Sequence, residues 1–166
     1  WYRKAAEQGD KDAQFWLGGM YFQGEGVAQD DAKAVEWTRK AAEQGHADAQ
    51  GLLGVMYLYG RGVPQDDAKA VEWTRKAAEQ GVVAAQFHLG GMYDQGRGVA
   101  QDDAKAAEWY RKAAEQGDKD AQFWLGGMYF QGEGVAQDDA KAVEWTRKAA
   151  EQGHADAQGL LGVMYL

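Results

Sequence analysis

Few residues in this chain are of the types that carry out chemistry. It contains no cysteine and no serine, which excludes disulfides, thiolate metal sites and the nucleophiles of both residue types. Three histidines occur, His46, His88 and His154. His46 and His154 occupy the same place in two copies of a repeat, so we expect surface residues and not a shared metal site. His88 has Asp94 six positions later, but acid–base catalysis needs an oriented partner within hydrogen-bond reach, which the sequence does not fix.

Two other motifs could carry chemistry, and both favour a structural role. The pair Asp30-Asp31 occurs in four copies, which indicates helix caps, because an acid–base pair would need only one tuned instance. The loop Gly24-x-Gly26-Val27 lacks the preceding strand and the third glycine of a dinucleotide-binding site, so it predicts a turn. We therefore predict no enzyme activity, no metal site and no cofactor.

An internal repeat must position all of these residues. Trp1–Leu58 recurs without change as Trp109–Leu166, and a shorter unit of 36 residues begins at positions 1, 37, 73, 109 and 145. A fixed period of this length predicts a stack of small helical units whose core runs between neighbours. We expect one such solenoid over residues 1–166.

Two helices are predicted in each repeat. The first, called the A helix here, is expected over residues 12–23, and either Gly24 or Gly26 suits a left-handed C-terminal stop. The second, the B helix, is expected over residues 32–44, which are rich in alanine, lysine and glutamate. The Asp30-Asp31 pair is well placed to cap it.

The residues that recur in register resemble the Sel1-like repeat family, which is related to the tetratricopeptide helix hairpins. The matching residues are Ala13-Gln14, Leu17-Gly18, Met20-Tyr21, Gly24-x-Gly26-Val27, Asp30, Lys33-Ala34, Trp37 and residues 39–45. The resemblance implies an all-α fold, a right-handed α/α superhelix of about four and a half 36-residue helix-pair repeats. It also implies a protein–protein adaptor that has no shared set of catalytic residues.

The copies differ mainly on one side of the A helix. At about 100° per residue, the variable positions fall on one arc and the identical ones on the opposite side. In the first copy the variable positions are Asp12, Phe15, Trp16, Gly19, Phe22 and Gln23. Identical residues must fit the same neighbour in every repeat. The resemblance places the variable arc on the concave side, where we expect a groove that binds a protein or peptide segment.

The contents of this arc favour binding, since exposed aromatic clusters are uncommon and aromatic anchors dominate protein interfaces. Trp16, Trp124, Leu52 and Leu58 are the expected anchors. Packing against the preceding B helix is an equally weighted alternative for Phe15, Phe87 and Phe123. The predicted partner-binding residues are Phe15, Trp16, Gly19, Phe22, Gln23, Leu52, Val55, Leu58, Tyr59, Phe87, His88, Asp94, Phe123, Trp124, Phe130, Leu160 and Val163.

Family sequences usually carry a small polar residue at the position of Trp16 and valine at that of Gly19. The indole of Trp16 could therefore simply fill the space that the glycine leaves. The tryptophan of the B helix, Trp37, is identical in every copy and is predicted to lie in the core.

Composition narrows the class of partner. A net charge of −8 argues against binding nucleic acid, and the sequence has no apolar run of the ~18 residues that a membrane helix needs. The compartment stays open, since cytoplasm and periplasm both suit such a chain. The alternative function is a designed or consensus-like array without a selected ligand. Trp1 and Leu166 lie inside predicted helices, so exposed apolar ends would indicate a longer protein or end-to-end self-association.

Overall fold

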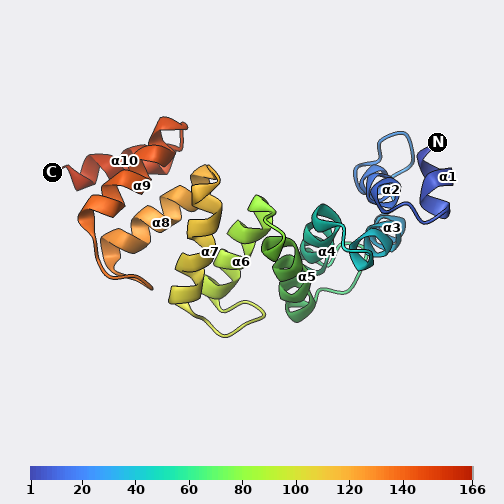
Figure 1. The fold of residues 1–166 in the computed structure, drawn as a ribbon, viewed down its shortest axis with the longest axis horizontal. Coiled ribbons are helices and arrows are strands. Elements are labelled where there is room, and N and C mark those ends of the chain that lie inside the picture. The colour runs from blue at the N-terminus through green and yellow to red at the C-terminus, as the bar shows by residue number, and fades with distance from the viewer. Residues whose placement is uncertain (166) are drawn as a thin grey trace. The chain divides into compact units, whose positions relative to one another are not determined.

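The computed structural model describes residues 1–165, and these residues are all-α (Figure 1). Stacked helix pairs follow one another along the chain, as the repeat predicts. Within the described residues the helices are α1 (Tyr2–Glu7), α2 (Lys11–Gln23), α3 (Asp31–Glu43), α4 (Ala47–Tyr59), α5 (Asp67–Glu79), α6 (Val83–Gln95), α7 (Asp103–Glu115), α8 (Lys119–Gln131), α9 (Asp139–Glu151) and α10 (Ala155–Met164).

The chain forms two compact units, Trp1–Ala85 and Gln86–Leu166. In the first unit α2 packs on α1 and α3, and α4 packs on α3 and α5. In the second unit α8 packs on α7 and α9, and α9 packs on α10. The A helices are α2, α4, α6, α8 and α10, and the B helices are α3, α5, α7 and α9. Each unit is therefore a short solenoid in which A and B helices alternate.

The helix ends follow the predicted caps. The side chain of Asp30 accepts a hydrogen bond of 3.0 Å from the backbone N–H of Lys33, so Asp30 is the N-cap and α3 begins at the next residue. At the other end of the turn, Gly24 has a φ of +75° and closes α2 in the left-handed conformation. Both helix types begin one residue earlier than predicted.

The capping aspartates make the stability of the fold depend on pH. In all four the backbone N–H of the lysine three residues later lowers the pKa of the carboxyl group, burial opposes this shift, and the lysine side chain adds to it. Because the folded-state pKa lies below the unfolded one, this stabilisation is present above about pH 4 and is lost as the pH falls through the folded-state value. The four residues are Asp30, Asp66, Asp102 and Asp138.

We expect the melting temperature at pH 3 to fall well below that at pH 7. Replacing the four capping aspartates with asparagine keeps an N-cap acceptor but removes the titrating group. The asparagine variant should therefore lose less on acidification than the parent, in thermal unfolding followed by circular dichroism. An equal loss in both proteins would assign the acid sensitivity to other carboxyl groups.

A and B helices approach closely where the A helix carries glycine. A Cβ atom placed on Gly18 would lie 2.5 Å from Thr38 Oγ1 and 3.0 Å from the backbone nitrogen of Thr38. The same close contact joins Gly54 to Thr74 and Gly126 to Thr146. In α6 the equivalent Gly90 faces the ring of Tyr110 instead. Glycine recurs at this position because the crossing leaves no room for a side chain.

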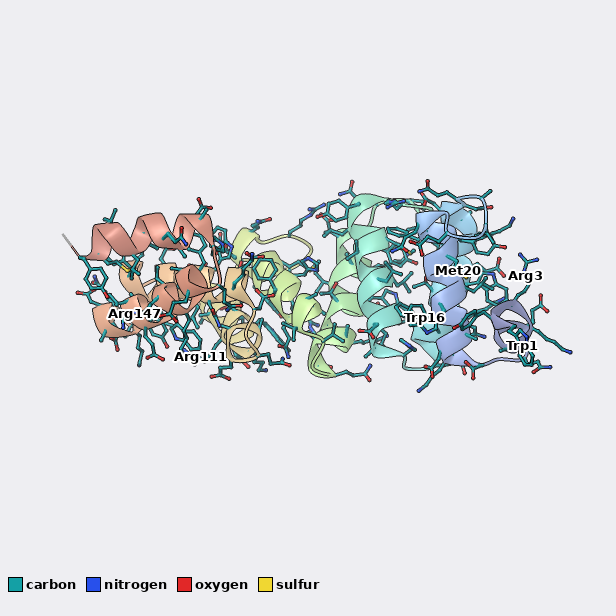
Figure 2. The ribbon with its side chains drawn as sticks, turned by 90° about the horizontal axis from the view of Figure 1, so that it is seen from above. Trp1, Arg3, Trp16, Met20, Arg111 and Arg147 are labelled. Atoms are coloured by element: carbon teal, nitrogen blue, oxygen red, sulfur yellow. The ribbon has the colours of Figure 1, made fainter. Side chains whose placement is uncertain are left out.

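Two kinds of side-chain hydrogen bond tie successive helix pairs together. Gln44 donates to the side chain of the buried Gln14 over 2.7 Å, and Gln14 donates to the carbonyl of Ala6 over 3.1 Å. Arginines of α1 and of several B helices donate to the hydroxyl of a tyrosine on the next A helix or directly after it. Figure 2 labels three of these arginines, Arg3, Arg111 and Arg147, which bond to Tyr21, Tyr129 and Tyr165. These contacts explain why the glutamine, arginine and tyrosine recur.

The prediction that Trp37 lies in the core is wrong. The residue is only half-buried, and Lys40 lies over its ring with Nζ 4.3 Å from the ring centroid. The same lysine–tryptophan contact recurs on α5, α7 and α9. Identity between copies here reflects a repeated cation–π contact on the surface, worth about 0.5–1 kcal/mol at such sites.

Candidate binding site

In the first unit, the variable side of α2 forms a cleft with α4. The cleft has a volume of about 310 Å³, at the lower end of the range for ligand pockets. It lies on the variable side of α2, and one residue that is identical in every copy, Met20, also lines it. The other identical residues of α2 are buried against the neighbouring helices. Figure 2 labels two of its residues, Trp16 and Met20, on α2. The cleft is lined by Phe15, Trp16, Gly19, Met20, Phe22, Gln23, Glu25, Asp48 and Leu52.

His46 fixes one wall of this cleft. Its Nδ1 accepts the backbone N–H of Ala49 over 3.2 Å and so caps α4. Its ring stacks on Phe15 with 4.5 Å between ring centroids, and only 14% of its side chain is exposed. The prediction that His46 is a surface residue is therefore wrong. Phe15 is half-buried, and the ring that it stacks on is that of His46, the N-cap residue of α4.

Arg61 fixes the other wall. Its guanidinium lies 3.8 Å from the ring centroid of Phe22 and pairs with Asp31 over 2.9 Å. Arg61 belongs to the glycine-rich turn after α4, so this turn reaches back to α2 and to the start of α3. One face of the Phe22 ring is thereby covered.

The remaining predicted residues of the first unit differ in exposure. Trp16 is 58% exposed and Tyr59 is 65% exposed, whereas Leu52 and Val55 are half-buried. Leu58 is only 7% exposed and belongs to the core, so the prediction that it anchors a partner is wrong. It is equivalent to Phe22, but on α4 this position is covered. Of the predicted partner-binding residues, those of α2 line the cleft together with one from α4, Leu52.

In the second unit, α8 and α10 repeat the same sequence. Phe123 stacks on His154 with 4.6 Å between centroids, and Trp124 is 46% exposed. Phe130 and Leu160 are half-buried, and Val163 is 59% exposed. A Cβ atom on Gly127 would have no atom within 4 Å, as is also true for Gly19.

Tyr110 on α7 is a residue of this face that the sequence reasoning missed. It is 3% exposed, and its ring centroid lies 5.7 Å from that of Phe87 and 6.3 Å from that of Trp124. The rings of Tyr110 and Trp124 are nearly parallel, at 12°. The other complete B helices carry threonine at this position. This difference among the B helices was the available signal.

The two titratable groups of the variable face of α6, His88 and Asp94, have pKa values that are shifted by different neighbours. His88 is exposed along one side, yet the protein around its imidazole disfavours the charged form and lowers its pKa, while Asp118 opposes this shift. Burial raises the pKa of Asp94, and the charge of Asp103 raises it further. The charge that acts on His88 thus comes from Asp118 and not from Asp94.

Within residues 1–165, no three histidine or carboxylate side chains converge in a way that would hold a metal ion. No helix in this range is both long and apolar enough to span a bilayer. The cleft offers apolar and aromatic surface with carboxylates at its edge.

The comparison with family models matches the Sel1 repeat along most of the chain. The matched segments are residues 1–10, 11–46, 47–82, 83–118 and 119–154. The chain belongs to the Sel1 repeat family. Among curated protein sequences no significant match was found.

Several solved structures resemble this Sel1 repeat chain. The protein c5321, a protective antigen of uropathogenic Escherichia coli with an SLR fold, is 47% identical at a TM-score of 0.96 and covers 99% of this chain. A Sel1 repeat protein from Oxalobacter formigenes is 44% identical at a TM-score of 0.91 and covers 98%. The immunity protein Pa5087 of Pseudomonas aeruginosa is 26% identical at a TM-score of 0.59 and covers 94%. The chain spans 35%, 48% and 58% of these proteins, respectively.

Membership of the Sel1 repeat family gives the general role of the chain. It is a helical repeat scaffold of a kind that typically serves protein–protein interactions, in a family that is generally non-catalytic. The relatives are natural bacterial proteins.

Proposed function

We propose that this chain is a non-catalytic recognition scaffold that binds an extended segment or a helix of a partner protein on the variable face of its A helices. Trp16, Leu52 and Trp124 are the anchors, and the other exposed or half-buried residues of that face surround them. Within each unit, an apolar face with an exposed tryptophan suits a peptide segment of this kind better than a small metabolite.

The exposure of Trp16 is the observation that carries this proposal. A tryptophan that leaves 58% of its surface exposed beside an open cleft has a large apolar area without cover. On the same helix, the residues that recur in all copies are buried between helices, except Met20, which lines the cleft. The contrast supports a face that is free to bind.

A selection from a random peptide display library tests the proposal. The parent protein is compared with a variant that carries Trp16→Asn, Leu52→Asn and Trp124→Asn, and circular dichroism verifies that the variant is folded. We expect the parent to enrich peptides that the variant loses, because truncating an aromatic anchor costs about 2 kcal/mol or more of binding free energy.

Two outcomes would contradict the proposal. Enrichment that is unaffected by the three substitutions would assign binding to another surface. No enrichment at all would favour a structural array without a ligand. In that case, an apparent molar mass from light scattering that rises with protein concentration would indicate self-association.

A further inference from the structure

One helix pair of the second unit contains an aromatic side chain that its counterpart in the first unit lacks. α7 and α3 differ at only two positions, where α7 has Ala107 and Tyr110 and α3 has Val35 and Thr38. The A helices before them, α6 and α2, both carry two successive glycines at the crossing. At the crossing itself the two pairs differ only in these two B-helix residues, whereas the A-helix faces also differ, with Trp16 and Phe22 on α2 in place of His88 and Asp94 on α6.

In the second unit the tyrosine occupies the space above the two glycines. A Cβ atom on Gly90 would lie 2.7 Å from Cδ1 of Tyr110, and one on Gly91 would lie 3.5 Å from its hydroxyl oxygen. Phe87 and Trp124 flank the ring. The chain thus shows what an A-helix face of this kind accommodates, which is one tyrosine ring between two aromatic side chains.

In the first unit the equivalent space is open. Thr38 is fully buried and its hydroxyl ends against Gly18, so it does not extend to Gly19. A Cβ atom on Gly19 would have nothing within 4 Å, and Gly19 lies in the lining of the cleft. Phe15 and Leu52, equivalent to Phe87 and Trp124, lie in the same lining.

The edge of the cleft indicates the charge of its occupant. Glu25 and Asp48 both line the cleft and are exposed, so two carboxylates surround an apolar interior. The nearby cation, Arg61, is paired with Asp31 and stacked on Phe22. An aromatic side chain that enters the cleft therefore meets a negative rim, which favours lysine or arginine beside it.

We propose that this cleft binds one aromatic side chain, of the size of tyrosine, in a basic segment of the partner protein. The inference rests on the proposed function and names the residue type that the anchors recognise. The second unit carries a second such site, because its sequence repeats the lining and the space above Gly127 is equally open. The residues of the second site are Phe123, Trp124, Gly127, Phe130 and Leu160.

A variant that fills both clefts tests this assignment. Val35→Ala with Thr38→Tyr makes α3 identical to α7, and Val143→Ala with Thr146→Tyr does the same for α9. Both variant helices then have the sequence of α7, which already forms a helix in this chain. The hydroxyls of Thr38 and Thr146, which are buried without a hydrogen-bond partner among the described residues, are removed at the same time.

The probe is a fluorescein-labelled heptapeptide, Gly-Lys-Lys-Tyr-Lys-Lys-Gly, followed by fluorescence anisotropy. Its controls replace the tyrosine with alanine or the lysines with glutamate. We expect the parent to bind the tyrosine peptide about tenfold or more tighter than either control. The filled variant should lose this difference while its melting temperature stays at or above that of the parent.

The remaining outcomes separate this inference from the proposed function. Equal binding of the tyrosine peptide by the parent and the filled variant would overturn the cleft assignment. Absence of tyrosine-dependent binding by the parent would overturn it too. The proposed function would still hold if the display selection enriched peptides that the Trp16→Asn, Leu52→Asn and Trp124→Asn variant loses. A selection that enriches nothing would overturn both.

Discussion

Gly18→Ala is expected to lower the free energy of unfolding by about 2 kcal/mol, although alanine is the better helix former. The added Cβ would lie 2.5 Å from Thr38 Oγ1, 3.0 Å from the Thr38 backbone nitrogen and 3.2 Å from the carbonyl oxygen of Ala34. Two of these atoms belong to the backbone of α3, so relief requires the two helices to move apart. The contact is repeated in other helix pairs, and each pair transmits its spacing to the next.

The adjacent glycine provides the matched control. Gly19 lies in the same helix, but its Cβ position has no atom within 4 Å, so Gly19→Ala should raise the stability by about 0.5–1 kcal/mol. Gly162→Ala is a second control, because Gly162 is equivalent to Gly18 but its Cβ position is also open. Urea unfolding followed by circular dichroism measures all three. A loss of similar size at Gly19 would contradict the assignment of the cost to the contact with α3.

The repeat allowed most of the fold to be predicted from the sequence. Predicted helices over residues 12–23 and 32–44 correspond to Lys11–Gln23 and Asp31–Glu43. The structure confirms these helices because the signals are local: an aspartate cap, a left-handed glycine, and a buried side that is nearly the same in every copy. Local signals depend only on neighbouring residues, which the sequence lists in order.

The contacts that shape the cleft could not be predicted in this way. Periodicity shows which side of α2 faces its neighbours, but not that His46 caps α4 and stacks on Phe15, nor that Arg61 returns to cover Phe22. The stacking of His46 on Phe15 and the contact of Arg61 with Phe22 each join residues from successive repeats. Leu58 was misplaced for the same reason, since a position that is half-exposed on α2 is buried on α4.

Tyr110 was missed for a different reason. The predicted binding face rests on the variable positions of the A helices, whereas Tyr110 lies on a B helix. The side chain at this B-helix position decides whether the space above the second of the two successive glycines on the preceding A helix is filled, as at Gly91, or open, as at Gly19. A tyrosine in one B helix and threonine in the other complete ones therefore changes the A-helix face, although the residue itself is buried.

Tyr110→Ala is expected to lower the free energy of unfolding by about 3–5 kcal/mol, the range for truncating a large aromatic core side chain. The ring is 3% exposed and contacts Phe87 on α6 and Trp124 on α8, so its loss leaves a cavity among three helices. The control Tyr110→Phe keeps the ring and removes only the hydroxyl. It should stay within about 1.5 kcal/mol of the parent in urea unfolding.

A third variant distinguishes lost packing from a defect in α7 itself. Ala107→Val with Tyr110→Thr gives α7 the sequence of α3, which already packs against an A helix with two glycines. It should therefore be more stable than Tyr110→Ala, because threonine fills the crossing at Gly90 as Thr38 does at Gly18. Equal stability of the two variants would show that threonine does not fill the crossing at Gly90.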